Sequence, residues 1–287
     1  MNRRTFIWFT LPSVLVMLVL MVFPLVTTVY LSFNEVFLRD LGSRQWVGLA
    51  NYRNVLSDPD FWAAFRLTIL FVAVVVPVHL ILGLGIANIL DRVARGRGLY
   101  IAALLLPFVV TPVVGTLMVR NLFDRGGLIS WLWKVFTDHP FVITSGNVKW
   151  VLIAHGIWAV TPFAVITFFA GMQTLPQERV EAAGLDGAGF WSIQRFVVIP
   201  HLKSLIIFIL LITTMDAYRV FDSSFVFGQS VGRSAQSLQV YNFKVALSQQ
   251  VGRLGKGNAI AVLTVIGIFV VLIPFLYKSY KEQVADR

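Results

Sequence analysis

The strongest constraint on this chain is a series of six apolar segments, each long enough to cross a lipid bilayer. They lie near residues 6–33, 65–90, 99–123, 149–172, 202–223 and 259–278. A helix rises about 1.5 Å per residue, so roughly 20 residues cross the hydrocarbon layer. Only helices satisfy their own backbone hydrogen bonds within one such segment. The sequence therefore predicts an all-α integral membrane protein with six transmembrane helices.

The composition supports this class and excludes others. Hydrophobic residues make up 57% of the chain and charged residues only 13%, which is unlike a soluble globular domain. The formal net charge of +10 could suggest a nucleic-acid partner. We expect no such partner, because the basic residues are scattered over loops and segment ends, where a bilayer favours them. The absence of cysteine excludes disulfides and thiolate-bound metals.

The distribution of arginine predicts the orientation in the membrane. Three arginines lie within the eight residues 91–98, whereas three are spread over the 31 residues 34–64. Positive charge is denser in short cytoplasmic loops. The last long loop, 224–258, also carries four cations, but long loops follow this rule poorly. We therefore expect a multi-pass protein with both termini in the cytoplasm.

The residues between the fourth and fifth apolar segments form an unusual polar element. It runs Glu181-Ala182-Ala183-Gly184-Leu185-Asp186-Gly187, then nine residues, then Val197-Val198-Ile199-Pro200. Pro176 and Glu178 suit the first turn of a helix, and the glycines at 184, 187 and 189 interrupt it. Apolar residues then follow at helical spacing. We expect a short helix, a glycine turn and a second short helix, ended by Pro200, at the membrane face.

This spacing resembles the EAA loop in permease subunits of bacterial ABC importers, whose pattern is E-A-A, three residues, G, nine residues, I-x-L-P. Val197 stands for the isoleucine of that pattern and Ile199 for its leucine. Further stretches resemble the carbohydrate-uptake branch, the binding-protein-dependent maltose and glycerol-phosphate type. They are Trp46–Tyr52, Asp58–Trp62, Gly83–Ala87, Leu106–Pro107, Phe221–Asp222, Tyr241–Phe243, Gly255 and Ala259–Val262. After the fifth segment the chain departs from the frequent T-x-G-G-P and has Phe227–Arg233.

The resemblance implies a type I ABC importer permease of the bacterial cytoplasmic (inner) membrane, with the MetI-like fold. It implies three regions: a first helix and outer loop (1–64), a permease core with five helices and the EAA loop at about 175–203 (65–278), and a cytoplasmic tail (279–287). The residues implied to couple the permease to its ATPase are Glu181, Ala182, Ala183, Gly184, Asp186, Gly187 and Pro200.

The resemblance also implies partners. They are a second, homologous permease that forms a heterodimer, two ATP-binding subunits, an extracytoplasmic solute-binding protein and the lipid bilayer. ATP and Mg would be used by the partner ATPases and not by this chain, because the sequence has no G-x-x-x-x-G-K-[ST] loop. No carboxylate pair, Ser-His-Asp set or metal-spaced histidine cluster indicates an enzyme or a metal site.

Polar residues inside the apolar segments are candidates for the solute path. Asp216, Arg219 and Ser223 fall at i, i+3 and i+7 and would share one helical face. Weaker candidates are Tyr218, Arg120, Asn121 and Thr161. Alternatively, Asp216 and Arg219 pair with each other, or Arg219 and Arg120 extend towards the interface. Hydrogen-bonding groups beside an aromatic ring suit a sugar, while an arginine also suits an anionic solute.

The function predicted from these features is ATP-driven, binding-protein-dependent import of a sugar or related polyhydroxy solute. A stand-alone secondary transporter driven by an ion gradient is the alternative. It would need ion sites at mid-membrane, commonly with an inverted repeat, and the sequence displays neither. A membrane scaffold without transport activity is disfavoured by the polar residues of the fifth segment.

Overall fold

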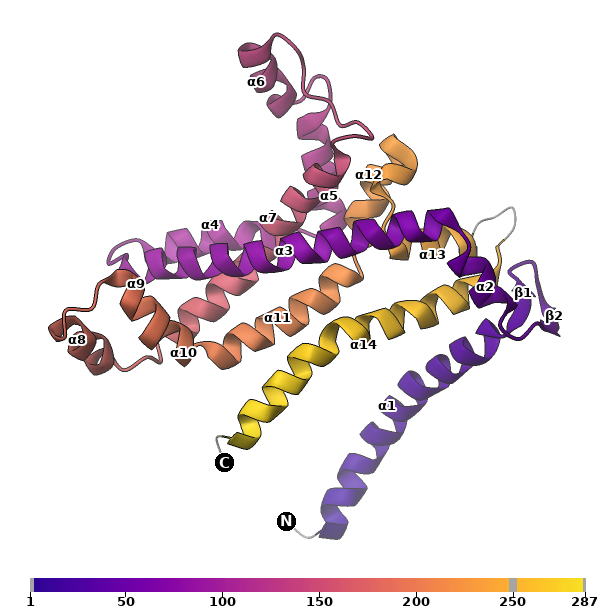
Figure 1. Cartoon of the computed structure of the whole chain (residues 1–287), viewed down its shortest axis with the longest axis horizontal. Coiled ribbons are helices and arrows are strands. Elements are labelled where there is room, and N and C mark those ends of the chain that lie inside the picture. The colour runs from indigo at the N-terminus through magenta and orange to yellow at the C-terminus, as the bar shows by residue number, and fades with distance from the viewer. Residues whose placement is uncertain (1–2, 248–251, 286–287) are drawn as a thin grey trace. The chain divides into compact units, whose positions relative to one another are not determined.

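A computed structural model of the chain describes residues 3–247 and 252–285, and most of them are helical (Figure 1). Residues 1–2 of the predicted first region and 286–287 of the predicted tail lie outside this range. Within it, five helices are long and apolar enough to cross a membrane, and a bent pair of helices makes a sixth candidate. The prediction of a mainly helical chain with about six crossings is therefore confirmed.

The elements follow one another in a simple order along the chain. The first half contains α1 (Arg3–Ser32), β1 (Asn34–Phe37), β2 (Asp40–Trp46), α2 (Ala50–Leu56), α3 (Pro59–Arg92), α4 (Arg97–Val109), α5 (Pro112–Phe123), α6 (Leu128–Thr137) and α7 (Val148–Met172). The second half contains α8 (Gln177–Leu185), α9 (Phe190–Ile193), a π-helical turn (Gln194–Val198), α10 (Ile199–His201), α11 (Lys203–Tyr218), α12 (Asp222–Val231), a 3-10 turn (Gly232–Ala235), α13 (Leu238–Leu247) and α14 (Leu254–Ala285).

The predicted third crossing, 99–123, is divided into two helices. It consists of α4 and α5, and the chain bends by 96° between α4 and the stretch Pro112–Thr137, which contains α5 and α6. Thr111, between α4 and α5, has an extended backbone (φ −60°, ψ 141°), and Pro112 follows it. Proline disfavours helical geometry in the residue before it and cannot donate a backbone hydrogen bond. The break therefore falls where the sequence places Pro112.

The predicted fifth crossing, 202–223, also contains a break. Helix α11 ends at Tyr218, and α12 begins at Asp222. The Ser237 hydroxyl donates a hydrogen bond of 2.7 Å to the Val220 carbonyl, which the break leaves without a helical partner. The break means that Ser223 does not continue the helical face of Asp216 and Arg219, so the predicted single stripe is wrong at that residue.

The chain divides into two compact units. The first comprises residues 1–63 and 239–269, and the second comprises residues 64–238 and 270–287. In the first unit, β1 and β2 form an antiparallel hairpin with Asn34 opposite Trp46. The Asn51 amide donates 2.9 Å hydrogen bonds to the carbonyls of Ser32 and Asn34, and the Leu38 N–H reaches the Gly252 carbonyl at 2.7 Å. These bonds join segments far apart in the sequence.

The second unit has a core of buried apolar side chains from α3, α7 and the residues that follow α7. They are Ala87, Ala164, Phe168, Met172, Val198, Leu202 and Ile209. Gly83 allows α3 to approach α7, since a Cβ atom on it would lie 2.6 Å from Cβ of Ala164. In this unit α4 and α11 also contact α7. Two members of this core, Val198 and Leu202, belong to the segment that carries the EAA-like sequence.

Candidate functional site

Residues 175–203 form a compact helical element between α7 and α11, as Figure 1 shows. Pro176 directly precedes α8, and Gly187 follows it with a left-handed backbone (φ +79°). The Ala188 N–H donates to the Ala183 carbonyl at 2.9 Å, which ends α8 with a turn that glycine favours. The predicted short helix, glycine turn and second short helix are therefore confirmed.

The sequence suggested that Pro200 ends this element, and the structure shows that it does not. It lies inside α10, and the chain continues through Leu202 into α11. The proline ring would clash with the carbonyl of Phe196 in a regular helix. The preceding turn is instead π-helical, with the Ile199 N–H bonded to the Gln194 carbonyl five residues earlier. The wider turn lets the chain pass the proline without a stop.

The surface of the 175–203 segment is exposed and partly apolar. Leu185 is 91% exposed, Trp191 81% and Phe196 71%. The predicted coupling residues Glu181, Ala182, Gly184, Asp186 and Gly187 are also exposed, while Ala183 is half-buried and Pro200 is exposed. Large exposed apolar side chains beside polar ones are typical of a surface that contacts another protein or the membrane.

The opposite side of the segment is fixed to the second unit. Val198 and Leu202 are buried in its core, and Leu175 and Ile193 pack against that core. The Thr174 hydroxyl and the His201 ring nitrogen Nε2 lie 3.0 Å apart, which connects the two ends of the segment. The segment is thus rooted in the packing of the helices and presents its other side to solvent.

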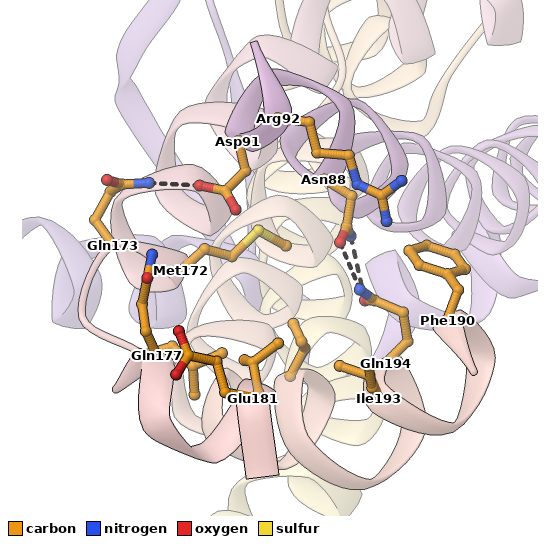
Figure 2. Close-up of a pocket in the computed structure, with 13 residues that line it drawn as sticks. Asn88, Asp91, Arg92, Met172, Gln173, Gln177, Glu181, Phe190, Ile193 and Gln194 are labelled. Carbon is orange, nitrogen blue, oxygen red and sulfur yellow. Dashed lines mark hydrogen bonds between the residues drawn. The ribbon is translucent and has the colours of Figure 1, made fainter. Parts of the chain in front are cut away.

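A cavity of about 560 Å³ lies between the segment and the ends of α3 and α7 (Figure 2). Its wall is formed by Asn88, Asp91, Arg92, Met172, Gln173, Leu175, Gln177, Val180, Glu181, Phe190, Ile193, Gln194 and Val198. The Glu181 carboxylate belongs to this wall. The cavity is therefore lined by both acidic and basic side chains, together with several amides.

Sequence reasoning missed the polar contacts that join α3 to the segment. Asn88 and Gln194 exchange two hydrogen bonds, of 3.2 Å from Asn88 Nδ2 and 2.5 Å from Gln194 Nε2, as Figure 2 shows. The guanidinium of Arg92 lies over the Phe190 ring, 4.9 Å from its centroid. Gln173 Nε2 donates to Asp91 at 2.7 Å. A usable signal was the asparagine at position 88 within the otherwise apolar run of residues 80–90.

The candidate solute-path residues lie on four different helices. Asp216 and Arg219 form an ion pair of 2.8 Å, and both side chains are more than half exposed. Tyr218, Thr161 and Ser223 are buried, Arg120 is half-buried and Asn121 is exposed. Helix α12 contacts both α5 and α7, so the elements that carry Ser223, Arg120 and Thr161 are neighbours. The alternative in which Asp216 pairs with Arg219 is realised.

Two buried polar side chains near these helices lack hydrogen-bond partners in the described part of the chain. They are the hydroxyl of Tyr218 on α11 and Nδ1 of His155 on α7. The His155 ring packs edge-on against Phe227, with centroids 6.2 Å apart. Among the described residues, no group of three or more histidine, aspartate or glutamate side chains is arranged to hold a metal ion.

Residues 80–280 match a family described as "Binding-protein-dependent transport system inner membrane component". The chain belongs to this family. Its members are transport permeases and not enzymes, so this chain is a membrane permease of the binding-protein-dependent kind. Family membership also decides against the stand-alone, ion-driven transporter considered from the sequence.

Curated relatives of this permease match along most of their length. The trehalose/maltose transport system permease protein MalF of Thermococcus litoralis is 31% identical over 272 residues, which are 92% of this chain and 88% of the relative. The trehalose transport system permease protein SugA of Mycobacterium tuberculosis is 29% identical over 91% of this chain and 84% of its own. A probable ABC transporter permease protein of Sinorhizobium fredii is 29% identical over 99% of this chain and 92% of the relative.

Solved structures show the same fold. A chain from a bacterial ABC transporter involved in the import of the acidic polysaccharide alginate superposes on this permease with a TM-score of 0.84. The match covers 97% of this permease and 96% of that chain, at 15% sequence identity. The predicted fold, that of a MetI-like ABC importer permease, is therefore confirmed.

Proposed function

We propose that this permease imports a sugar or a related polyhydroxy solute across the bacterial cytoplasmic membrane, using ATP hydrolysed by partner subunits. The observation that carries the proposal is the 175–203 segment, which is rooted in the helical core and exposes Leu185, Trp191 and Phe196 on its other side. Relatives whose names specify trehalose or maltose support the solute class.

The proposed assembly contains two permeases, two ATP-binding subunits and an extracytoplasmic solute-binding protein. This chain and a second, homologous permease form the pathway as a heterodimer, and the ATP-binding subunits bind ATP and Mg. A binding protein is supported by the family's description and by a related alginate transporter whose structure includes a periplasmic protein. Both termini lie in the cytoplasm, as the dense arginines of residues 91–98 favour.

In the proposed mechanism the 175–203 segment seats on one ATP-binding subunit. Glu181, Ala182, Gly184, Asp186 and Gly187 are exposed and available to that partner. When ATP draws the ATPases together, the segment moves, and the helices rooted in the same core move with it. The two permeases then change from inward-facing to outward-facing and receive the solute.

The proposed solute path follows the broken helices. Their breaks place hydroxyl groups such as Ser223 at helix starts instead of on long apolar faces. Among the residues that the structure describes, the buried hydroxyl of Tyr218 has no hydrogen-bond partner, and a solute hydroxyl can satisfy it. Thr161 and Arg120 lie on neighbouring helices, Asn121 follows Arg120, and the Asp216–Arg219 pair lies at the end of α11. An arginine here also suits an anionic solute.

Affinity purification of the tagged permease in mild detergent tests the proposal. We expect a second permease and an ATPase to co-purify, with ATP hydrolysis stimulated by the loaded binding protein. The Glu181→Lys variant should insert but lose ATP-driven uptake, because it reverses a charge on the proposed docking surface. Glu178→Lys makes the same charge change three residues earlier on α8, at a position outside the predicted coupling residues, and should retain more uptake. Normal uptake by Glu181→Lys would contradict the docking assignment.

A further inference from the structure

The 175–203 segment is attached to three helices, although the chain connects it to only two. Its ends continue into α7 and α11 through the backbone. Its attachment to α3 depends on side chains, chiefly the reciprocal hydrogen bonds between Asn88 and Gln194 (Figure 2). These two residues are 106 positions apart, so only the tertiary fold brings them together.

The geometry of this contact restricts relative movement. Asn88 Nδ2 also donates to the carbonyl of Leu84 at 2.8 Å, which fixes the orientation of its amide. Gln194 is only 8% exposed and begins the π-helical turn. Two opposed amide hydrogen bonds define both a distance and an angle between the two elements. Arg92 lies one turn after Asn88, and Phe190 lies one turn before Gln194. The Arg92 guanidinium is placed over the Phe190 ring and adds a second point of contact.

We propose that the Asn88–Gln194 pair is the joint that transmits movement of the 175–203 segment to α3, so that Asn88 and Gln194 are positioning residues for energy coupling. The proposal rests on the proposed docking of that segment on an ATP-binding subunit. With the joint intact, α3 moves with the segment as one body. With the joint broken, the segment still docks through its exposed side, but less of its movement reaches α3.

The first test compares transport with ATP hydrolysis in the full complex reconstituted in lipid vesicles. Asn88→Ala and Gln194→Ala should retain co-purification of the ATPase and its basal hydrolysis. Solute imported per ATP hydrolysed should fall about fivefold, the lower end of the usual coupling between two sites of a protein. The exchanged double variant Asn88→Gln with Gln194→Asn restores two facing amides of the same total length and should recover most of that ratio.

Controls separate a joint from a merely structural contact. Within the described part of the chain, the Thr167 hydroxyl on α7 donates to the Phe163 carbonyl of its own helix, and Thr167→Val should leave the transport ratio unchanged. If an alanine variant does not accumulate, the similarly sized Asn88→Leu, which also removes both amide hydrogen bonds, carries the same test. An unchanged ratio in the single variants overturns the proposal. Loss of ATPase binding in those variants also overturns it, because the pair would then support docking alone.

A distance measurement tests the movement itself. The chain has no cysteine, so spin labels at Ile89→Cys on α3 and Ser192→Cys on α9 report one defined distance. In the complex this distance should stay constant between nucleotide-free and ATP-bound states, and should vary after Asn88→Ala. If this distance changes between the two nucleotide states while Asn88 and Gln194 are both intact, the proposal that α3 and the segment move as one body is overturned. Failure of the proposed docking has a different signature, because no ATPase would then co-purify with any variant.

Discussion

Tyr241 donates a hydrogen bond of 2.6 Å to the carboxylate of Asp58, which lies 183 residues earlier in the chain. Lys256 forms an ion pair of 2.9 Å with the same carboxylate oxygen. Asp58 directly precedes α3, and its other carboxylate oxygen accepts a 3.0 Å hydrogen bond from the N–H of Asp60 in the first turn of that helix. One carboxylate thus connects the start of α3 with α13 and α14 in the first unit.

The Asp58 contacts predict a loss of stability when the carboxylate is neutralised. Asp58→Asn removes the ion pair with Lys256 and weakens the bond from Tyr241, which should cost about 2 kcal/mol. The measurement is the melting temperature of the purified permease in detergent. Lys256→Met should lower it as well, and the double variant should lose less than the sum because both changes remove one interaction. If the double variant lost as much melting temperature as the two single variants together, Asp58 and Lys256 would not share a contact.

The same cluster predicts a pH dependence. Burial raises the pKa of Asp58, but hydrogen bonds from Tyr241 and Lys256 outweigh it, so the net pKa lies below the ordinary value of 3.8. A carboxyl with a lowered pKa in the folded state stabilises the protein above its unfolded pKa. This contribution is lost as the pH falls from about 3.8 through the folded pKa. Melting curves should show this acid loss in the parent permease and less of it in Asp58→Asn.

The close approach of α3 and α7 predicts different effects for two neighbouring glycines. A Cβ at Gly83 would lie 2.6 Å from Ala164 Cβ, whereas a Cβ at Gly85 meets nothing within 4 Å. Gly83→Ala should therefore destabilise the helix pair by about 1–3 kcal/mol, as overpacking does. Gly85→Ala should be neutral or slightly stabilising, because alanine favours the helix. Equal melting temperatures for the two variants would show that α3 and α7 are not so close.

The left-handed backbone at Gly187 predicts a strained turn after substitution. Its φ is +79°, and no atom lies within 4 Å of the position that a Cβ would occupy. Gly187→Ala should therefore cost about 1–2 kcal/mol through the backbone alone. Gly189→Ala, equally open but with an ordinary backbone (φ −75°) and outside the predicted coupling residues, is the matched control and should be tolerated. Solute uptake and ATPase co-purification measure the effect, and equal uptake by both variants would contradict it.

The exposed Asp216–Arg219 pair predicts a functional effect without a structural one. An ion pair with both side chains more than half exposed contributes only about 0–1 kcal/mol to stability. Asp216→Asn and Arg219→Gln should therefore leave the melting temperature nearly unchanged. If the pair borders the proposed solute path, both variants should still alter the concentration of solute that gives half-maximal uptake. Unchanged uptake kinetics would remove these residues from the path.

The sequence by itself determined the class of the protein. Long apolar segments leave helices as the available structure in a bilayer, and the spacing from Glu181 to Pro200 identified the segment most informative about function. Local rules also predicted the start of α8 at Pro176 and the glycine turn at Gly187. These features depend on residues that are neighbours in the sequence, so the sequence alone is enough to predict them.

Only the tertiary structure decided how these parts contact one another. Asn88 and Gln194 are unremarkable in sequence, as are Asp58 and Tyr241, and each pair is brought together by packing between distant helices. The breaks at Thr111 and after Tyr218 interrupt segments whose hydropathy is continuous, because hydropathy measures burial in lipid and not helix geometry. Long-range hydrogen bonds and helix angles depend on the whole fold, so they could not be obtained from local pattern.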